Sequence, residues 1–212
     1  MSVDVRPIKT AAEGALAASF ALARPNLPGA DKVAALREEA FRRFEADGLP
    51  NRRIEEWKYT DLRALMREAK PLAPLPDAAA KRIAGQGMPA ASIEARRIVF
   101  VNGSFVPELS DLEDLEPGLA IRSMASALAA GDPRIVNRIG KIAPTSDTAV
   151  ALNTAFMGDG AVIEVAPGVA LARPIQLAFI NGVGPRVGEA GFGLIPGFAY
   201  TGPFEDITLK GA

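Results

Sequence analysis

The sequence contains no cysteine and no histidine among its 212 residues. Without cysteine, the chain cannot form a disulfide or supply a thiol nucleophile. Without histidine it has no imidazole base, so Ser-His-Asp and Cys-His catalysis are excluded, and a Cys/His zinc site cannot be built. These two absences leave carboxylate, lysine, tyrosine or backbone chemistry, or a protein that works only by binding.

Long apolar runs are also missing. The longest ones fall well short of the roughly 18 residues that a helix needs to span a bilayer. The N-terminal residues mix Asp4 with Arg6 and Lys9 and do not lead into the apolar segment of a secretory signal. We therefore expect a cytoplasmic protein without a membrane partner.

Charge is balanced overall but uneven along the chain. The formal net charge is −1, which gives no global reason to expect a nucleic-acid partner. Residues 1–100 carry 17 basic and 13 acidic side chains, whereas residues 101–212 carry 7 and 12. The first half is rich in alanine and arginine and the second in glycine, valine and isoleucine, which indicates two regions of different architecture.

The first region has the pattern of helices. Thr10 and Glu13 have capping-box spacing at the start of an Ala/Leu/Phe-rich stretch that continues to Ala23. Asp31 stands at the N-cap position of a second helix, and Gly48 is a natural residue to end it. The apolar face predicted for this second helix consists of Val33, Leu36, Ala40, Phe41 and Phe44.

A third helix is predicted over 60–69, with Thr60 as its N-cap. Its inward-facing side chains would be Leu62, Leu65 and Met66. A proline-rich connector follows, and a further short helix is expected over 77–85.

The second region changes to the pattern of strands. Residues 97–101 are rich in β-branched and aromatic side chains, and Asn102-Gly103 separates them from a second short run over 104–106. Asn-Gly between two such runs is the strongest short signal for a hairpin. An acidic, loop-like stretch is expected over 108–118.

Two short helices and then more strands are expected toward the C-terminus. Ser123 can cap a helix through Ala130, and Asp132-Pro133 can start another through Lys141. Short apolar segments separated by glycine-containing turns follow, which suggests the first coil of a sheet or β-solenoid. These segments are 149–156, 161–165 and 174–180.

Three segments, in order, resemble blocks of the SufD family of iron–sulfur cluster assembly proteins. The first is 48–62, which reads GLPNRRIEEWKYTDL. The second is 98–110, and the third runs from 151 to 175, with matching stretches at 151–156, 159–161, 167–169 and 173–175. The resemblance covers roughly residues 8–180 of the chain.

The resemblance implies both a fold and a role. SufD-like proteins have a helical region, then a right-handed parallel β-helix and a C-terminal helical region, and they run to about twice this length. We therefore expect an α+β fold, with helices over 1–95, the hairpin and short helices over 96–147, and the first β-helix coils over 148–212. By the same resemblance, the chain would be a non-enzymatic scaffold component. It would partner SufB-like proteins and the SufC-like ATPase, or form a SufD-like homodimer.

No cofactor is expected on this chain alone. The thiolates that usually hold iron–sulfur clusters are missing, and the family's cluster-related residues lie in its later part. The resemblance thus places the iron–sulfur cluster at the level of the assembled complex.

The residues from about 181 onward depart from the family pattern. One hypothesis is that the reading frame changes near Asn181 and that the chain is a truncated SufD homologue. Reading the coding DNA in the other frames would test it, because another frame should then continue the β-helix pattern. Two alternatives stay open: a truncated homologue without assembly activity, and a β-solenoid transferase. Such transferases usually rely on a histidine base and many repeats, which this sequence lacks.

The first family block concentrates charge and aromatic rings. It is the candidate partner surface, although the favoured interpretation is a packed helix-to-loop junction. It can bind an acidic patch on another protein, or stack a base on Trp57 or Tyr59. The alternative is a helix-to-loop junction in which both rings pack on the helices, while Glu55 and Glu56 pair with neighbouring cations. The candidate residues are Arg52, Arg53, Glu56, Trp57, Lys58, Tyr59, Thr60 and Asp61.

Two groups of carboxylates can each be interpreted as a functional site or as an exposed, solvated surface. A cluster at 55–61 can be an acid/base pair or a solvated face, and the favoured interpretation is the solvated face. A second cluster can bind a hard cation, but its spacing is not that of an EF-hand, so an exposed acidic loop is favoured. Its members are Asp111, Glu113, Asp114 and Glu116. We therefore predict no catalytic residue and no metal site.

Overall fold

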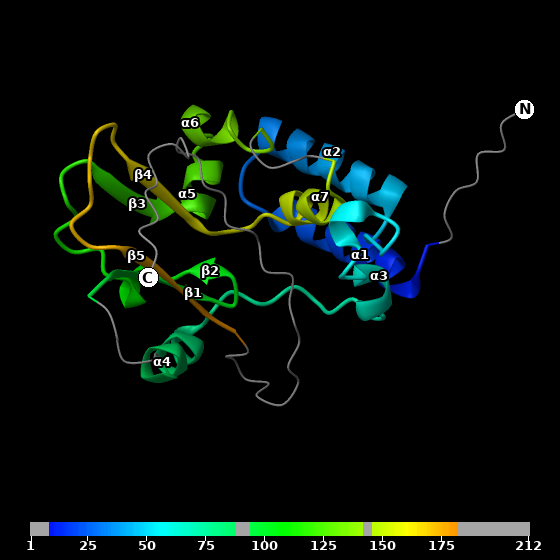
Figure 1. Cartoon of the computed structure of the whole chain (residues 1–212), viewed down its shortest axis with the longest axis horizontal. Coiled ribbons are helices and arrows are strands. Elements are labelled where there is room, and N and C mark those ends of the chain that lie inside the picture. Colours follow the sequence, from blue (N-terminus) through cyan, green and yellow to red (C-terminus); the bar gives the residue numbers. More distant parts are fainter. Residues whose placement is uncertain (1–8, 88–93, 142–145, 182–212) are drawn as a thin grey trace, which may run out of the picture.

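The computed structural model describes residues 9–87, 94–141 and 146–181 of the chain. Helices α1, α2, α3 and α7 lie at one end of the molecule, and two small sheets lie at the other (Figure 1). The helices are α1 (Ala11–Ala23), α2 (Lys32–Asp47), α3 (Leu62–Leu65), α4 (Ala78–Gly87), α5 (Met124–Ala129), α6 (Pro133–Val136) and α7 (Thr148–Ala155). The strands are β1 (Arg96–Val101), β2 (Ser104–Phe105), β3 (Leu119–Ser123), β4 (Ala161–Val165) and β5 (Ile175–Ile180). This mixture confirms the predicted α+β class.

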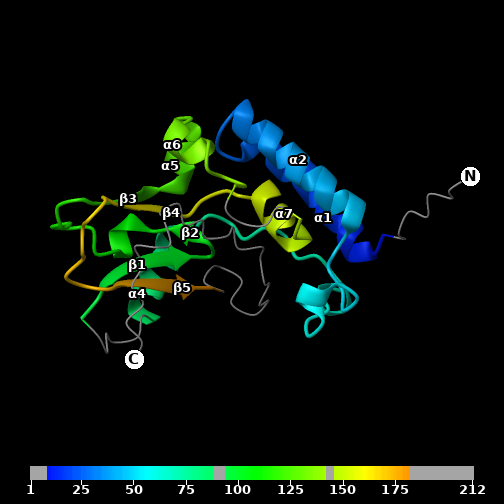
Figure 2. The same ribbon diagram turned by 45° about the horizontal axis from the view of Figure 1, so that its top comes forward.

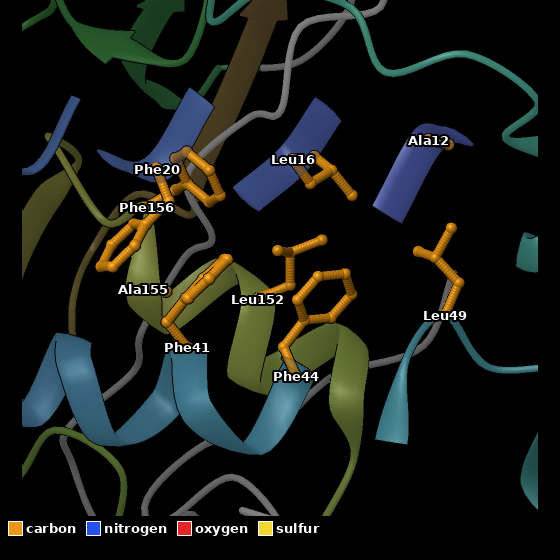
Figure 3. Close-up of a cluster of buried hydrophobic side chains, with 9 residues drawn as sticks. All are labelled: Ala12, Leu16, Phe20, Phe41, Phe44, Leu49, Leu152, Ala155 and Phe156. Atoms are coloured by element: carbon orange, nitrogen blue, oxygen red, sulfur yellow. The ribbon is translucent and has the colours of Figure 1, made fainter. Parts of the chain in front are cut away.

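Helices α1 and α2 pack through one apolar face each. The predicted capping box starts α1: Thr10 Oγ1 accepts from the Glu13 N–H at 3.2 Å, and Glu13 Oε2 accepts from the Thr10 N–H at 2.6 Å. From α2, Phe41 stacks on Phe20 of α1 with ring centroids 4.2 Å apart (Figure 3). The buried core around these rings consists of Ala12, Leu16, Phe20, Phe41, Phe44, Leu49, Leu152, Ala155 and Phe156.

Helix α7 completes this core although it follows the first strands in sequence. Phe156, at its C-terminal end, meets Phe20 edge-on with centroids 5.5 Å apart (Figure 3). We expected 149–156 to belong to the first β coil, but this segment is helical up to residue 155. A helix forms because the Asp147 carboxylate caps its first turn and the alanines that follow favour helix.

Two predicted helix starts are corrected by the structure. Asp31 lies at the N-cap position of α2, but its side chain makes no capping hydrogen bond and its φ is +46°. The third helix begins after Asp61, not Thr60, because Asp61 Oδ1 accepts from the Ala64 N–H at 2.9 Å.

The third helix is also much shorter than the predicted 60–69. It ends at Leu65, which is 70% exposed instead of facing inward. Beyond it the chain follows the surface of the helical core in an irregular path. The side chains of Met66, Ala69 and Leu72 pack against that core, which explains why the helix does not continue.

Strands β1 and β2 form the predicted hairpin. Asn102 and Gly103 have φ values of 50° and 84°, the two positive values that a type I′ turn requires. β5 pairs in parallel with the other edge of β1, and its register places Ile175 opposite Arg96. The predicted helix at 77–85 is present as α4, which packs Ala84 against this sheet.

Strands β3 and β4 form an antiparallel pair that packs against the first sheet. Ile98, Phe100, Phe105 and Ala161 are buried between the two sheets. Met124 and Leu128 of α5 pack with Val162 of β4 on the other side of this pair.

Two of these elements differ from the prediction. β3 was not predicted, because its sequence, LAIRS, has few β-branched residues and becomes a strand through pairing with β4. The helix predicted to continue to Lys141 ends at Val136.

Both sheets remain open in the described ranges. Sheet order is β2-β1-β5 in one and β3-β4 in the other, and neither closes on itself. The parallel β-helix therefore stays a prediction, and the divergent tail after 181 lies outside the described residues. In the part of the chain that the structure describes, no helix is long and apolar enough to cross a membrane.

Candidate partner-binding site

The candidate residues lie in a closed loop between α2 and α3, hereafter the 50–63 loop. The Arg63 N–H donates to the Pro50 carbonyl at 3.2 Å and joins the two ends of the loop. The loop lies near the ends of α1 and α2, at the end of the molecule away from the sheets (Figure 2, cyan). A compact loop whose ends meet in this way is an Ω-loop, a kind of segment that often carries function.

Local hydrogen bonds fix the backbone of the 50–63 loop. Asn51 Oδ1 accepts from the Arg53 N–H at 3.0 Å, which makes an Asx turn. A single 3₁₀ turn, η2 (Glu55–Trp57), follows, and the Thr60 N–H then donates to the Trp57 carbonyl at 2.8 Å. These consecutive turns give the loop a defined shape before any partner binds.

Trp57 anchors the loop to α7. Its indole Nε1–H donates to Asp147 Oδ2 at 3.1 Å. The other carboxylate oxygen of Asp147 accepts from the N–H groups of Ala149, at 2.8 Å, and Val150, at 3.2 Å. Because one carboxylate caps α7 and also holds the indole, the position of the loop is tied to the start of that helix.

Glu13 holds the base of the loop from α1. Besides its capping-box contact, its Oε1 accepts from the Leu49 N–H at 2.8 Å and lies 4.0 Å from Arg63 Nε. The side chain is 5% exposed. Burial disfavours the charged carboxylate, but the hydrogen bonds from Thr10 and Leu49 and the Arg63 charge outweigh it, so the pKa of Glu13 is lowered.

The outer face of the loop carries exposed aromatic, apolar and basic side chains. Tyr59 is 89% exposed and Ile54 is 40% exposed. Lys58 Nζ lies 5.3 Å from the Tyr59 ring centroid and also pairs with Glu55. The other exposed candidate residues are Arg52, Arg53, Glu56 and Thr60.

The structure thus brings all the predicted site residues into one loop but divides them into two roles. Trp57 and Asp61 turn toward structural partners, Asp147 and the first turn of α3. The packed-junction interpretation holds for Trp57 but is wrong for Tyr59, which projects into solvent. The expected pairing of Glu55 with a neighbouring cation is confirmed by its contact with Lys58.

The acidic stretch 108–118 is organised around a buried arginine. Arg96, 1% exposed, points its guanidinium into this stretch. Its acceptors are the carbonyl oxygens of Asp111 at 2.7 Å, Glu113 at 3.0 Å and Asp114 at 3.0 Å, and Glu116 Oε2 at 3.1 Å. Among the described residues, no group of three or more carboxylates is arranged to hold a metal ion.

Sequence reasoning missed three residues that position these segments. Glu13 was assigned only to its capping box, although its second oxygen holds Leu49. Asp147 was not singled out, yet an aspartate before an alanine-rich stretch is an N-cap signal. Arg96 lies just before the strand predicted over 97–101, and no sequence signal indicated that its side chain is buried.

Comparison with known proteins places the chain in a family. A family model described as the SufBD protein N-terminal region matches residues 26–177, which include the 50–63 loop. An iron–sulfur cluster assembly SufBD family protein of Synechocystis sp. is 34% identical over 140 residues, which make up 65% of this chain and 30% of the relative. The aligned part therefore spans less than a third of the relative's length. On these matches, the chain belongs to the SufBD family of iron–sulfur cluster assembly proteins and contains the N-terminal region of that family.

Proposed function

We propose that the chain is a SufD-like component of an iron–sulfur cluster assembly scaffold and that it acts by binding SufB-like and SufC-like partners. Family membership supports the pathway. The observation that carries the binding role is the 50–63 loop, whose backbone is fixed from within while Tyr59 and most of its charged side chains are exposed. Such an arrangement suits a surface that meets another protein.

We further propose that the chain contributes no catalytic group. Two of the three carboxylates of the loop are already engaged: Glu55 pairs with Lys58, and Asp61 accepts from the first turn of α3. The sequence has neither cysteine nor histidine, so its residues offer a cluster neither a thiolate nor an imidazole ligand. In this proposal, the cluster is the cargo of the assembled complex.

The parallel β-helix implied by the resemblance is part of the same proposal. β1 and β5 are far apart in sequence but pair in parallel and without a register shift along their whole length. A parallel β-helix stacks its strands in this way, one coil on the next. We infer that β1 and β5 begin such a stack, with α4 covering its outer face.

Co-expression of the tagged chain with SufB and SufC from the same organism tests the proposal. We expect all three proteins to elute together in one peak on size-exclusion chromatography, and SufB with SufC alone to give a smaller complex. Elution of the chain by itself, while SufB and SufC still associate, would favour a homologue without assembly activity.

A further inference from the structure

We propose that the exposed face of the 50–63 loop binds an acidic, leucine-containing segment of a partner protein. The inference rests on the proposed function, because it names the chemistry of the partner that the same surface would meet. The residues of this face are Arg52, Arg53, Ile54 and Tyr59.

The charges that remain available on the loop are mainly positive. Its charged residues are Arg52, Arg53, Glu55, Glu56, Lys58, Asp61 and Arg63. Those with partners inside the molecule are Glu55, Lys58, Asp61 and Arg63. Arg52 and Arg53 are exposed and form no ion pair with any described residue. The exposed carboxylate of Glu56 offsets one of these two positive charges. Each guanidinium can bind a carboxylate through two parallel N–H···O bonds, which favours an acidic partner.

Exposed apolar side chains on the loop and in the helix that follows it indicate that the partner is more than a charged chain. Tyr59 and Ile54 on the loop, and Leu65 in the following helix, are 89%, 40% and 70% exposed. Tyrosine and arginine are the residue types most enriched where binding energy concentrates, because a large ring or guanidinium plane covers much area with few rotatable bonds. A leucine of the partner would cover this apolar surface.

The fixed backbone of the loop lowers the cost of binding. Its two ends are joined at Pro50 and Arg63, its middle is held by Trp57 on Asp147, and its base is held by Glu13. A surface that is ordered before binding loses less conformational entropy when the partner docks.

A nucleic acid fits this face less well. Of the two rings proposed for base stacking, Trp57 is half-buried and its N–H is engaged by Asp147, which leaves only Tyr59. Single-strand binding needs several rings in a basic groove, so the observations favour a protein segment.

A peptide titration of the full chain tests the inference. The probe is a fluorescein-labelled peptide with the sequence of residues 108–118, ELSDLEDLEPG, which alternates acidic residues with leucine. Binding is measured by polarisation of the label and by the emission of Trp57, the only tryptophan of the chain. We expect saturable binding that weakens as salt is raised. Replacing either Arg53 with Glu or Tyr59 with Ala should weaken it roughly tenfold.

Matched controls distinguish binding at this face from non-specific electrostatic attraction to the protein. Arg82→Glu reverses an exposed cation on α4 that pairs with no described residue, and should leave the affinity unchanged. A peptide with Gln and Asn in place of Glu and Asp should not bind. The inference is overturned if the acidic peptide does not bind, if Arg53→Glu and Arg82→Glu behave alike, or if an oligo-dT of similar length binds as tightly.

The same variants distinguish this inference from the proposed function. If Arg53→Glu and Tyr59→Ala co-purify with SufB and SufC as the wild type does, this docking face is wrong and the scaffold role stands. If the wild type binds the acidic peptide but never co-purifies with SufB and SufC, the scaffold role is wrong and the docking face stands.

Discussion

The indole N–H of Trp57 donates to a carboxylate oxygen of Asp147 at 3.1 Å, across 90 positions of sequence. The other oxygen of the same carboxylate caps α7, which packs into the helical core. The single tryptophan of the chain is therefore not an exposed stacking ring but the anchor of an exposed loop. Whatever binds the 50–63 loop meets a surface held in place by the core.

This contact should be measurable as a coupling energy. Trp57→Phe removes the N–H donor, and Asp147→Asn keeps an oxygen that can cap α7 but replaces the carboxylate. We expect each change to lower the free energy of unfolding by about 1–2 kcal/mol. The two changes should couple by about 0.5–1.5 kcal/mol in a double-mutant cycle followed by urea and circular dichroism. Strictly additive effects would mean that the hydrogen bond contributes nothing.

Glu13 should make part of the stability depend on pH. Its carboxylate is hydrogen-bonded in the folded state and its pKa is lowered, so folding favours the ionised form. The contribution is present above the ordinary pKa of 4.5 and is lost as the pH falls through the lower folded value. We expect Glu13→Gln to lower the free energy of unfolding by about 1–3 kcal/mol at pH 7. In urea titrations the gap from the wild type should shrink below pH 4.5, and a gap that stays constant with pH would contradict this account.

Gly48 is required where α2 turns into the loop. Its φ is +73°, and an added Cβ would lie 2.6 Å from Glu13 Oε1, the atom that accepts from Leu49. Gly48→Ala should therefore cost about 2–3 kcal/mol by thermal denaturation, from backbone strain and the displaced carboxylate. Gly14→Ala is the matched control, because Gly14 lies inside α1 with open space around it and should gain about 0.5–1 kcal/mol. Equal effects at the two glycines would rule out the steric argument.

Arg96 should be the most sensitive basic residue of the sheet region. Its guanidinium satisfies three backbone carbonyls and the Glu116 carboxylate in the 108–118 stretch. Arg96→Met leaves these groups without a donor, and we expect a loss of about 3–5 kcal/mol together with faster proteolysis within 108–118. Arg96→Lys keeps the charge but has fewer donors, so it should fall between the wild type and Arg96→Met. Unchanged proteolysis in Arg96→Met would show that the arginine does not organise this stretch.

Arg37 presents the opposite case, a buried charge with little compensation. It is 3% exposed on the apolar face of α2, where burial lowers its pKa to about 10. Its Nη2 donates to the Met157 carbonyl at 2.6 Å, while its Nε has no partner among the described residues. Arg37→Met keeps the volume and removes the buried charge, so we expect a melting temperature equal to or above that of the wild type. Arg37→Ala leaves a cavity and should lose about 2–4 kcal/mol.

Local patterns predicted the elements whose formation depends on nearby residues. The capping box at Thr10, the Asn102-Gly103 turn and the Ser123 cap each act within a few residues, and all three are present. Two features were not predicted because they depend on distant residues. The end of α3 at Leu65 depends on packing of the following residues on the helical core. Strand β3 depends on pairing with β4. The segment 149–156 was predicted to belong to the first β coil, but the Asp147 cap makes it helical up to residue 155.

The sequence by itself determined the family, the α+β class, the position of the candidate loop and the absence of thiol and imidazole chemistry. These properties depend on residue identity and short-range order, which the sequence states directly. Only the tertiary structure decided that Trp57 turns inward while Tyr59 points outward, and that Glu13, Asp147 and Arg96 hold segments distant in sequence. The direction in which these side chains point depends on which hydrogen-bonding groups lie within reach of them. Residues distant in sequence come within that reach only when the chain folds.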